Sequence, residues 1–163
     1  MADQVSILQG VVEASLVLLG FSGAVVALGK TPPREWTGVN RMRIWTLIGA
    51  SITPLIISAG LLVAIYAEVT NKLTMQIGSL ITAAAVLFFA IQILRLNLRI
   101  PKDDPDRIPR LLLFFFQATG YAAAGLLIWN AFFGAEFWPI LLTLFLSLIH
   151  AARMFARLLF RPL

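Results

Sequence analysis

Five apolar stretches, each long enough to cross a lipid bilayer as a helix, constrain the fold of this chain more than any other feature. A helix needs roughly 20 mostly apolar residues to cross a hydrocarbon core about 30 Å thick. We place the stretches at about residues 5–29, 44–69, 73–94, 111–131 and 137–160. They show no alternation of period two and are much longer than the ~10 residues of a membrane β-strand. The sequence therefore predicts an all-α integral membrane protein, a bundle of five transmembrane helices in a single domain over residues 1–163.

The break between the last two stretches depends on three residues that interrupt the apolar sequence, Gly134, Glu136 and Pro139. A single helix over residues 111–150 would be about 60 Å long at 1.5 Å per residue, which is twice the hydrocarbon core. We therefore expect a tight turn at this point. The last helix then carries Arg153 and Arg157 in its final turns, where both side chains could extend to the membrane interface.

The basic residues predict which way the helices run. Twelve of the 13 Lys and Arg residues fall in three clusters, and the exception is Lys72. The clusters are Lys30, Arg34, Arg41 and Arg43; Arg95, Arg99, Lys102, Arg107 and Arg110; and Arg153, Arg157 and Arg161. The positive-inside rule places all three in the cytoplasm, with the N-terminus outside and the C-terminus inside. We expect a cell inner (plasma) membrane protein whose basic loops contact anionic headgroups of the inner leaflet.

Several kinds of chemistry are disfavoured by the residues the chain lacks. It has no cysteine and one histidine, so disulfides, thiolate metal sites and multi-histidine metal or haem sites within one copy are not expected. No phosphate-binding glycine loop, paired nucleophile and base, or basic motif interleaved with aromatic residues is present. We expect no catalytic residue, metal, cofactor or nucleic-acid partner, and the chain is predicted not to be an enzyme.

Glu13 is the strongest candidate for a functional residue. Counted from an outer boundary near Val5, it lies roughly 12 Å deep in the membrane. A carboxylate there is costly unless it is paired, hydrated or protonated. Gln9 lies one helical turn above Glu13 and Ser6 about two turns above, so the three form a polar stripe on one face. A water-filled vestibule would explain this stripe, and so would hydrogen bonding to neighbouring side chains in a packed interface.

Three further polar residues are candidates for an ion or proton path. Gln92 and Gln117 lie at a similar depth in the inner half, and His150 lies close to the midplane. If the first and fifth helices are neighbours, His150 and Glu13 could form a proton relay, because imidazole titrates near neutral pH. The alternative is that His150 is a hydrogen-bonded packing residue.

Pro54 lies in the middle of the second stretch and is a candidate hinge. It has no backbone N–H to donate to the carbonyl of Ala50, which a nearby Ser or Thr hydroxyl or a water molecule could satisfy. The simplest interpretation is a structural kink. The functional interpretation is a polar crevice or hinge facing the centre of the bundle.

Two classes of function fit these observations. The first is a homo-oligomeric channel, or a transporter linked to protons or cations, because five short helices enclose little more than a narrow crevice. The second is a non-catalytic subunit or scaffold of a larger membrane complex, or a helical bundle that binds lipid or quinone. Small residues spaced four apart in the first and fourth stretches also predict close contact between those helices, within one chain or between copies.

Overall fold

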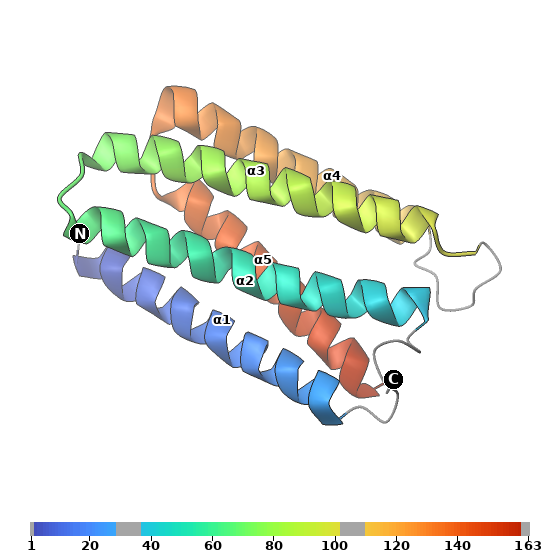
Figure 1. Cartoon of the computed structure of the whole chain (residues 1–163). Helices are drawn as coiled ribbons and strands as arrows, with labels where there is room; N and C mark the ends of the chain where they lie inside the picture. The colour runs from blue at the N-terminus through green and yellow to red at the C-terminus, as the bar shows by residue number, and fades with distance from the viewer. Residues whose placement is uncertain (1, 29–36, 102–109, 161–163) are drawn as a thin grey trace.

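The computed structural model of the chain describes residues 2–28, 37–101 and 110–160, which are helical apart from short turns and contain no strand. Each of its five long helices is long and apolar enough to span a membrane. Consecutive helices run in opposite directions, and the bundle they form is shown in Figure 1. The helices are α1 (Ala2–Leu28), α2 (Gly38–Tyr66), α3 (Asn71–Leu98), α4 (Arg110–Trp129) and α5 (Trp138–Phe160), with a π-helical turn η2 (Asn130–Gly134) after α4.

The five predicted stretches correspond to the five helices, although several ends differ. Helix α2 begins at Gly38, ahead of the predicted residue 44, because Thr37 caps it: the Asn40 backbone N–H donates to the Thr37 hydroxyl at 3.3 Å. Arg41 and Arg43, which we predicted in a loop, therefore lie in the first turns of α2. Helix α3 continues to Leu98 and so includes Arg95. Helices α2 and α3 thus extend beyond their apolar stretches, and Arg41, Arg43 and Arg95 lie within them.

Helix α2 lies at the centre of the bundle and α1 at its edge. Helix α2 packs against α1, α3 and α5, while α4 packs mainly against α3. Each helix has an apolar segment of 18 residues that marks it as a candidate span. Of this segment, 39% is buried inside the bundle in α2 and 17% in α1, so α1 is less covered by its neighbours. Helix α1 packs on α2 and α5. In the described part of the chain, the first and fourth helices therefore do not form the close contact that we predicted.

Asn130 fixes the turn between α4 and α5. Its Nδ2 donates to the hydroxyl of Ser79 at 2.8 Å and to the carbonyl of Glu136 at 2.8 Å, and its Oδ1 accepts the Glu136 N–H at 3.0 Å. Ala135 ends the π-helical turn in the left-handed conformation, with a φ of 54°. The turn that we predicted at Gly134–Pro139 is therefore present, and α3 holds it through Ser79.

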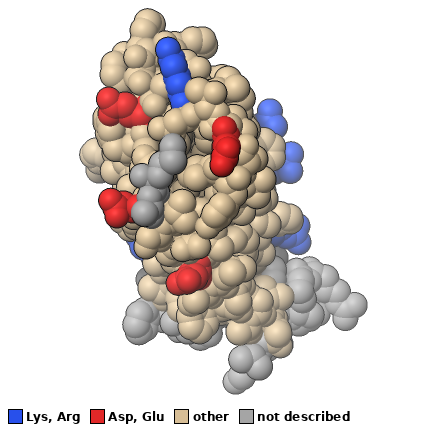
Figure 2. Space-filling view, turned by 90° about the vertical axis from the view of Figure 1, so that its left-hand side faces the viewer, with Lys and Arg blue, Asp and Glu red and all other residues tan. Residues whose placement is uncertain are grey.

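The two ends of the bundle differ in charge. Figure 2 views the end at which α1 begins, and acidic side chains are spread over this face. The acidic residues of the described part are Asp3, Glu13, Glu68 and Glu136, all in the half of the bundle nearest this end. Arg41, Arg43, Arg95, Arg99 and Arg157 lie toward the opposite end. Lys30, Arg34, Lys102, Arg107 and Arg161 lie outside the described residues.

Candidate functional site

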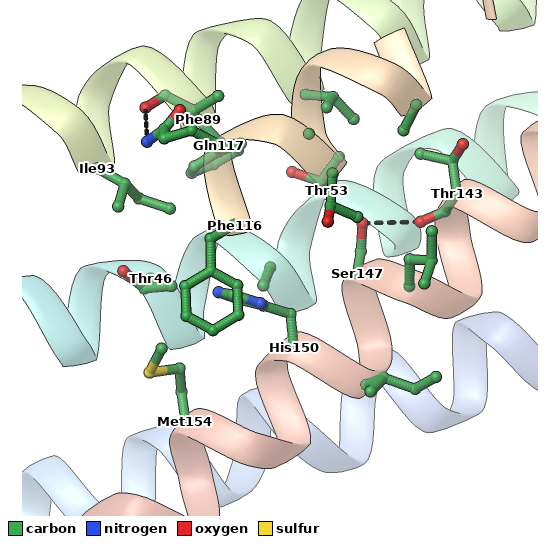
Figure 3. A pocket seen from close by; sticks show the side chains of 18 of the residues that line it. Thr46, Thr53, Phe89, Ile93, Phe116, Gln117, Thr143, Ser147, His150 and Met154 are labelled. Atoms are coloured by element: carbon green, nitrogen blue, oxygen red, sulfur yellow. Dashed lines mark hydrogen bonds between the residues drawn. The ribbon is translucent and has the colours of Figure 1, made fainter. Parts of the chain in front are cut away.

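A cavity of about 310 Å³ lies between helices α2, α3, α4 and α5. Most of the side chains around it are apolar, as Figure 3 shows for Phe89, Ile93 and Met154. A pocket of a few hundred Å³ with apolar walls and a small number of polar groups is typical of a small-molecule site. The polar residues that line it are Thr46 and Thr53 of α2, Gln117 and Thr119 of α4, and Thr143, Ser147, His150 and Arg153 of α5.

All five hydroxyl groups that line the cavity donate to carbonyls of their own helices. Thr53 donates to the carbonyl of Gly49 at 2.8 Å, and Thr143 donates to that of Pro139 at 2.9 Å. Ser147 donates to the carbonyl of Thr143 at 3.0 Å, as drawn in Figure 3. A hydroxyl that donates to a carbonyl of the preceding turn needs no other acceptor. The unsatisfied polar groups of the cavity are therefore found on other residues.

Gln117 presents a buried acceptor at the cavity. Its side chain is 8% exposed, and its Nε2 donates to the carbonyl of Ala90 on α3 at 2.9 Å. Its Oε1 is buried and has no hydrogen-bond partner in the described part of the chain. Leaving a buried polar atom unpaired costs about 1–3 kcal/mol, so this oxygen favours a bound molecule that can donate to it.

Phe116 of α4 joins His150 and Arg153 of α5 into one cluster. The His150 ring meets the Phe116 ring edge to face, with 5.1 Å between centroids and 86° between planes. The guanidinium carbon of Arg153 lies 3.9 Å from the centroid of the same ring, in the geometry of a cation–π contact. The Nε and Nη2 atoms of Arg153 are buried and have no hydrogen-bond partner among the residues that the structure describes. The aromatic ring holds both basic side chains at the cavity.

A second cavity, of about 430 Å³, lies beside the first between α2 and α3. Thr46, Phe89 and Ile93 line both cavities, and Gln92 lines only the second. The Phe89 ring lies against the backbone of Gly49, where an added methyl group would overlap it. The position of this ring thus depends on a glycine in the facing helix.

The structure brings together only some of the predicted site residues. Gln117 and His150 line the first cavity and Gln92 lines the second. Glu13 and Gln9 lie on the exposed side of α1, and no hydrogen bond or ion pair within the described part of the chain reaches the Glu13 carboxylate. Helices α1 and α5 do pack against each other. Glu13 lines neither of these two cavities, and no hydrogen bond joins it to His150 in the described part of the chain, so the relay stays a prediction.

Pro54 is buried within α2, which continues on both sides of it. The hydroxyls of Ser51 and Thr53, which could have satisfied the Ala50 carbonyl, donate instead to the carbonyls of Leu47 and Gly49. Pro54 is one residue from Thr53, which lines the cavity. A hinge at this position therefore remains a prediction.

Arg153 and Phe116 were not predicted as site residues. The sequence suggested only that Arg153 reaches the membrane interface, and Phe116 lies within the run Leu111–Phe116, where nothing distinguishes it from the neighbouring apolar residues. The one available signal was an arginine placed well before the end of an apolar helix. Its aromatic partner comes from another helix and follows from tertiary packing alone.

No family model, curated protein or solved structure matches this chain. Among the described residues, no group of three or more His, Asp or Glu side chains could hold a metal ion. The function has to be argued from the cavity and from the exposed side of α1.

Proposed function

We propose that this membrane-embedded protein is a non-catalytic binding protein. It takes a small amphipathic molecule into the first cavity, between α2, α3, α4 and α5. The observation that carries this proposal is the set of buried polar atoms without partners on residues that line a largely apolar cavity: Oε1 of Gln117 and Nε and Nη2 of Arg153. An apolar body would fill the cavity, and a polar headgroup would meet these atoms. Lipids and quinones have this construction.

A lateral opening between α4 and α5 would admit such a molecule from the bilayer. Thr119 of α4 and Ile149 of α5 both line the cavity and are both exposed on the outside of the bundle. These two helices contact each other less than either contacts its main partner, α3 for α4 and α2 for α5. In the predicted orientation, Arg153 lies in the cytoplasmic half, so a headgroup would enter from the inner leaflet.

Photolabelling tests the binding site directly. The protein in phosphatidylcholine nanodiscs would be irradiated with a diazirine-bearing fatty acid and, separately, with the fatty alcohol of the same chain length. We expect saturable labelling of α4 and α5 peptides by at least one probe. Ala123→Phe should abolish it by filling the cavity, whereas Ala122→Phe should not, because Ala122 is exposed and does not line the cavity. Absence of saturable labelling in the unaltered protein would contradict the proposal.

A homo-oligomeric channel or a proton- or cation-linked transporter is the second candidate, and the exposed side of α1 favours it. Glu13 faces outward roughly 12 Å into the predicted span, where a lipid-facing carboxylate is costly. Gly10, one turn away, has open space around it. A second copy covering this side would shield Glu13, and a ring of copies would form a ring of carboxylates, as cation channels have.

Ion flux and oligomeric state distinguish this candidate from a monomeric binding protein. We expect cation or proton flux in proteoliposomes to fall at least tenfold in Glu13→Gln and to persist in Glu68→Gln, a control at the exposed α2–α3 turn. A monomer in lipid without flux would exclude the channel. A different polypeptide recovered in stoichiometric amount after mild detergent extraction would instead favour a subunit or scaffold.

A further inference from the structure

The guanidinium group of Arg153 has one edge whose two N–H donors are unpaired in the described part of the chain. Nε and Nη2 lie on the same edge of the planar group, and their N–H bonds point in nearly parallel directions. Both atoms are buried, and within residues 2–28, 37–101 and 110–160 neither has a hydrogen-bond partner. This is the edge that binds the two oxygens of a carboxylate or phosphate group side by side. A single acceptor could satisfy only one of the two donors well.

Phe116 restrains the guanidinium group without pairing this edge. The guanidinium carbon lies over the ring, 3.9 Å from its centroid. An aromatic ring accepts no conventional hydrogen bond from Nε and Nη2, so a cation–π contact leaves these N–H groups for another partner. The contact restrains the side chain before an anion binds, which lowers the entropy lost on binding.

No carboxylate of the described residues is placed to neutralise Arg153. Its neighbours one turn away on either side of α5 are His150 and Arg157, which add no negative charge. Asp3, Glu13, Glu68 and Glu136 all lie in the other half of the bundle. A partly buried cation without a counter-charge is costly in a membrane interior, and an anionic ligand would remove that cost.

We infer that the ligand of the cavity is an anionic amphiphile whose carboxylate or phosphate headgroup binds the Nε–Nη2 edge of Arg153. Its hydrocarbon chain would lie among the apolar side chains of α3 and α4, such as Val86 and Phe89. A neutral quinone is a poorer fit, because its carbonyls could accept from Arg153 but would leave the positive charge uncompensated. This inference rests on the proposed binding function and specifies the charge of the headgroup.

Competition between probes of one chain length tests the charge of the headgroup. Labelling by the diazirine-bearing fatty acid would be competed with dodecanoate, dodecyl phosphate and dodecanol in nanodiscs, at alkaline pH so that the carboxylate is ionised. At least one anion should compete about tenfold or more better than dodecanol, as expected for a charge-assisted pair of hydrogen bonds. The order of the two anions tells whether the site prefers a carboxylate or a phosphate.

Two substitutions separate the guanidinium edge from positive charge in general. Arg153→Gln should reduce the advantage of the anions over dodecanol to about one. Arg153→Lys should retain only part of it, because an ammonium group keeps the charge without the two-donor edge. Arg157→Gln, one turn further along the helix, should leave the advantage unchanged.

The outcomes distinguish this inference from the binding function on which it rests. Saturable labelling by the alcohol probe, with dodecanol competing as well as both anions in the unaltered protein, would overturn the anionic ligand and leave the binding function standing. An equal loss of anion preference in Arg157→Gln would show that overall positive charge, and not Arg153, selects the ligand, which would also overturn the inference. If neither probe labels the cavity saturably, both proposals fail.

Discussion

At the scale of single residues, packing in this bundle depends on small residues that lie directly against a large side chain. Gly49 is one such position, because the ring of Phe89 lies directly against its backbone and lines both cavities. Gly60, on the same helix, has open space around it. The two glycines therefore provide a matched pair, in which the same substitution meets a side chain at one position and nothing within the bundle at the other.

We expect Gly49→Ala to destabilise the protein by about 1–3 kcal/mol, because the new methyl group displaces the Phe89 ring. Gly60→Ala should be neutral or stabilise by up to about 1 kcal/mol through its helix propensity. Thermal or denaturant unfolding in a mild detergent measures both. Equal effects of the two substitutions would contradict the Phe89 contact.

Asn130 provides a second prediction at this scale. Replacing it with Leu removes three hydrogen bonds and leaves groups of Ser79 and Glu136 unpaired, so we expect a loss of about 2–4 kcal/mol. Asn97→Leu is the control, since Asn97 is also buried but its Oδ1 has no partner. That substitution should cost less than about 1 kcal/mol in the same unfolding assay.

These residue roles show where sequence reasoning stops. The depth of Gln117, in the inner half, and that of His150, near the midplane, follow from counting residues along each helix. That they line one cavity depends on how α4 and α5 are rotated and on which helices they meet, which a depth counted along a single helix does not determine. The partner of Asn130 on α3 is 51 positions away in the chain, and such a contact has no local signal.

At the scale of the helix, apolar length predicts the five long helices and says less about where each one ends. All five helices were predicted because a run of about 20 apolar residues is a local property of the sequence. Helix α2 begins ahead of its apolar stretch because Thr37 caps it, and apolar length does not report a cap. Helix α2 also contains Pro54, and a single substitution tests how this proline affects the helix.

Pro54→Ala restores a backbone donor to the carbonyl of Ala50. We expect it to stabilise α2, raising the free energy of unfolding by about 1–3 kcal/mol. If Pro54 is a hinge, saturable photolabelling of the cavity should fall or slow in the same variant. If stability rises and labelling keeps both its extent and its rate, Pro54 is only a structural kink.

At the scale of the whole molecule, the separation of charge between the two ends of the bundle is the property most open to a direct test. We expect the variant with Arg41, Arg43, Arg95 and Arg99 all changed to Glu to insert in mixed or inverted orientation. Because the natural chain has no cysteine, a single Asn71→Cys at the α2–α3 turn reports the side by labelling with an impermeant maleimide. Lys72→Glu should leave the labelling unchanged, and labelling that is also unchanged in the four-residue variant would mean that other features set the orientation.

The packing of α5 against α2 also has a consequence for how the protein is made. Helices α1 and α2, and likewise α3 and α4, are pairs of chain neighbours that can associate as soon as each pair is inserted. Helix α5 instead returns to the middle of the bundle, beside α2, and brings His150 and Arg153 with it. During synthesis the first four helices would present an open trough toward the lipid. The cavity is complete only once α5 packs beside α2, so an amphiphile already lying in that trough would be enclosed at this step.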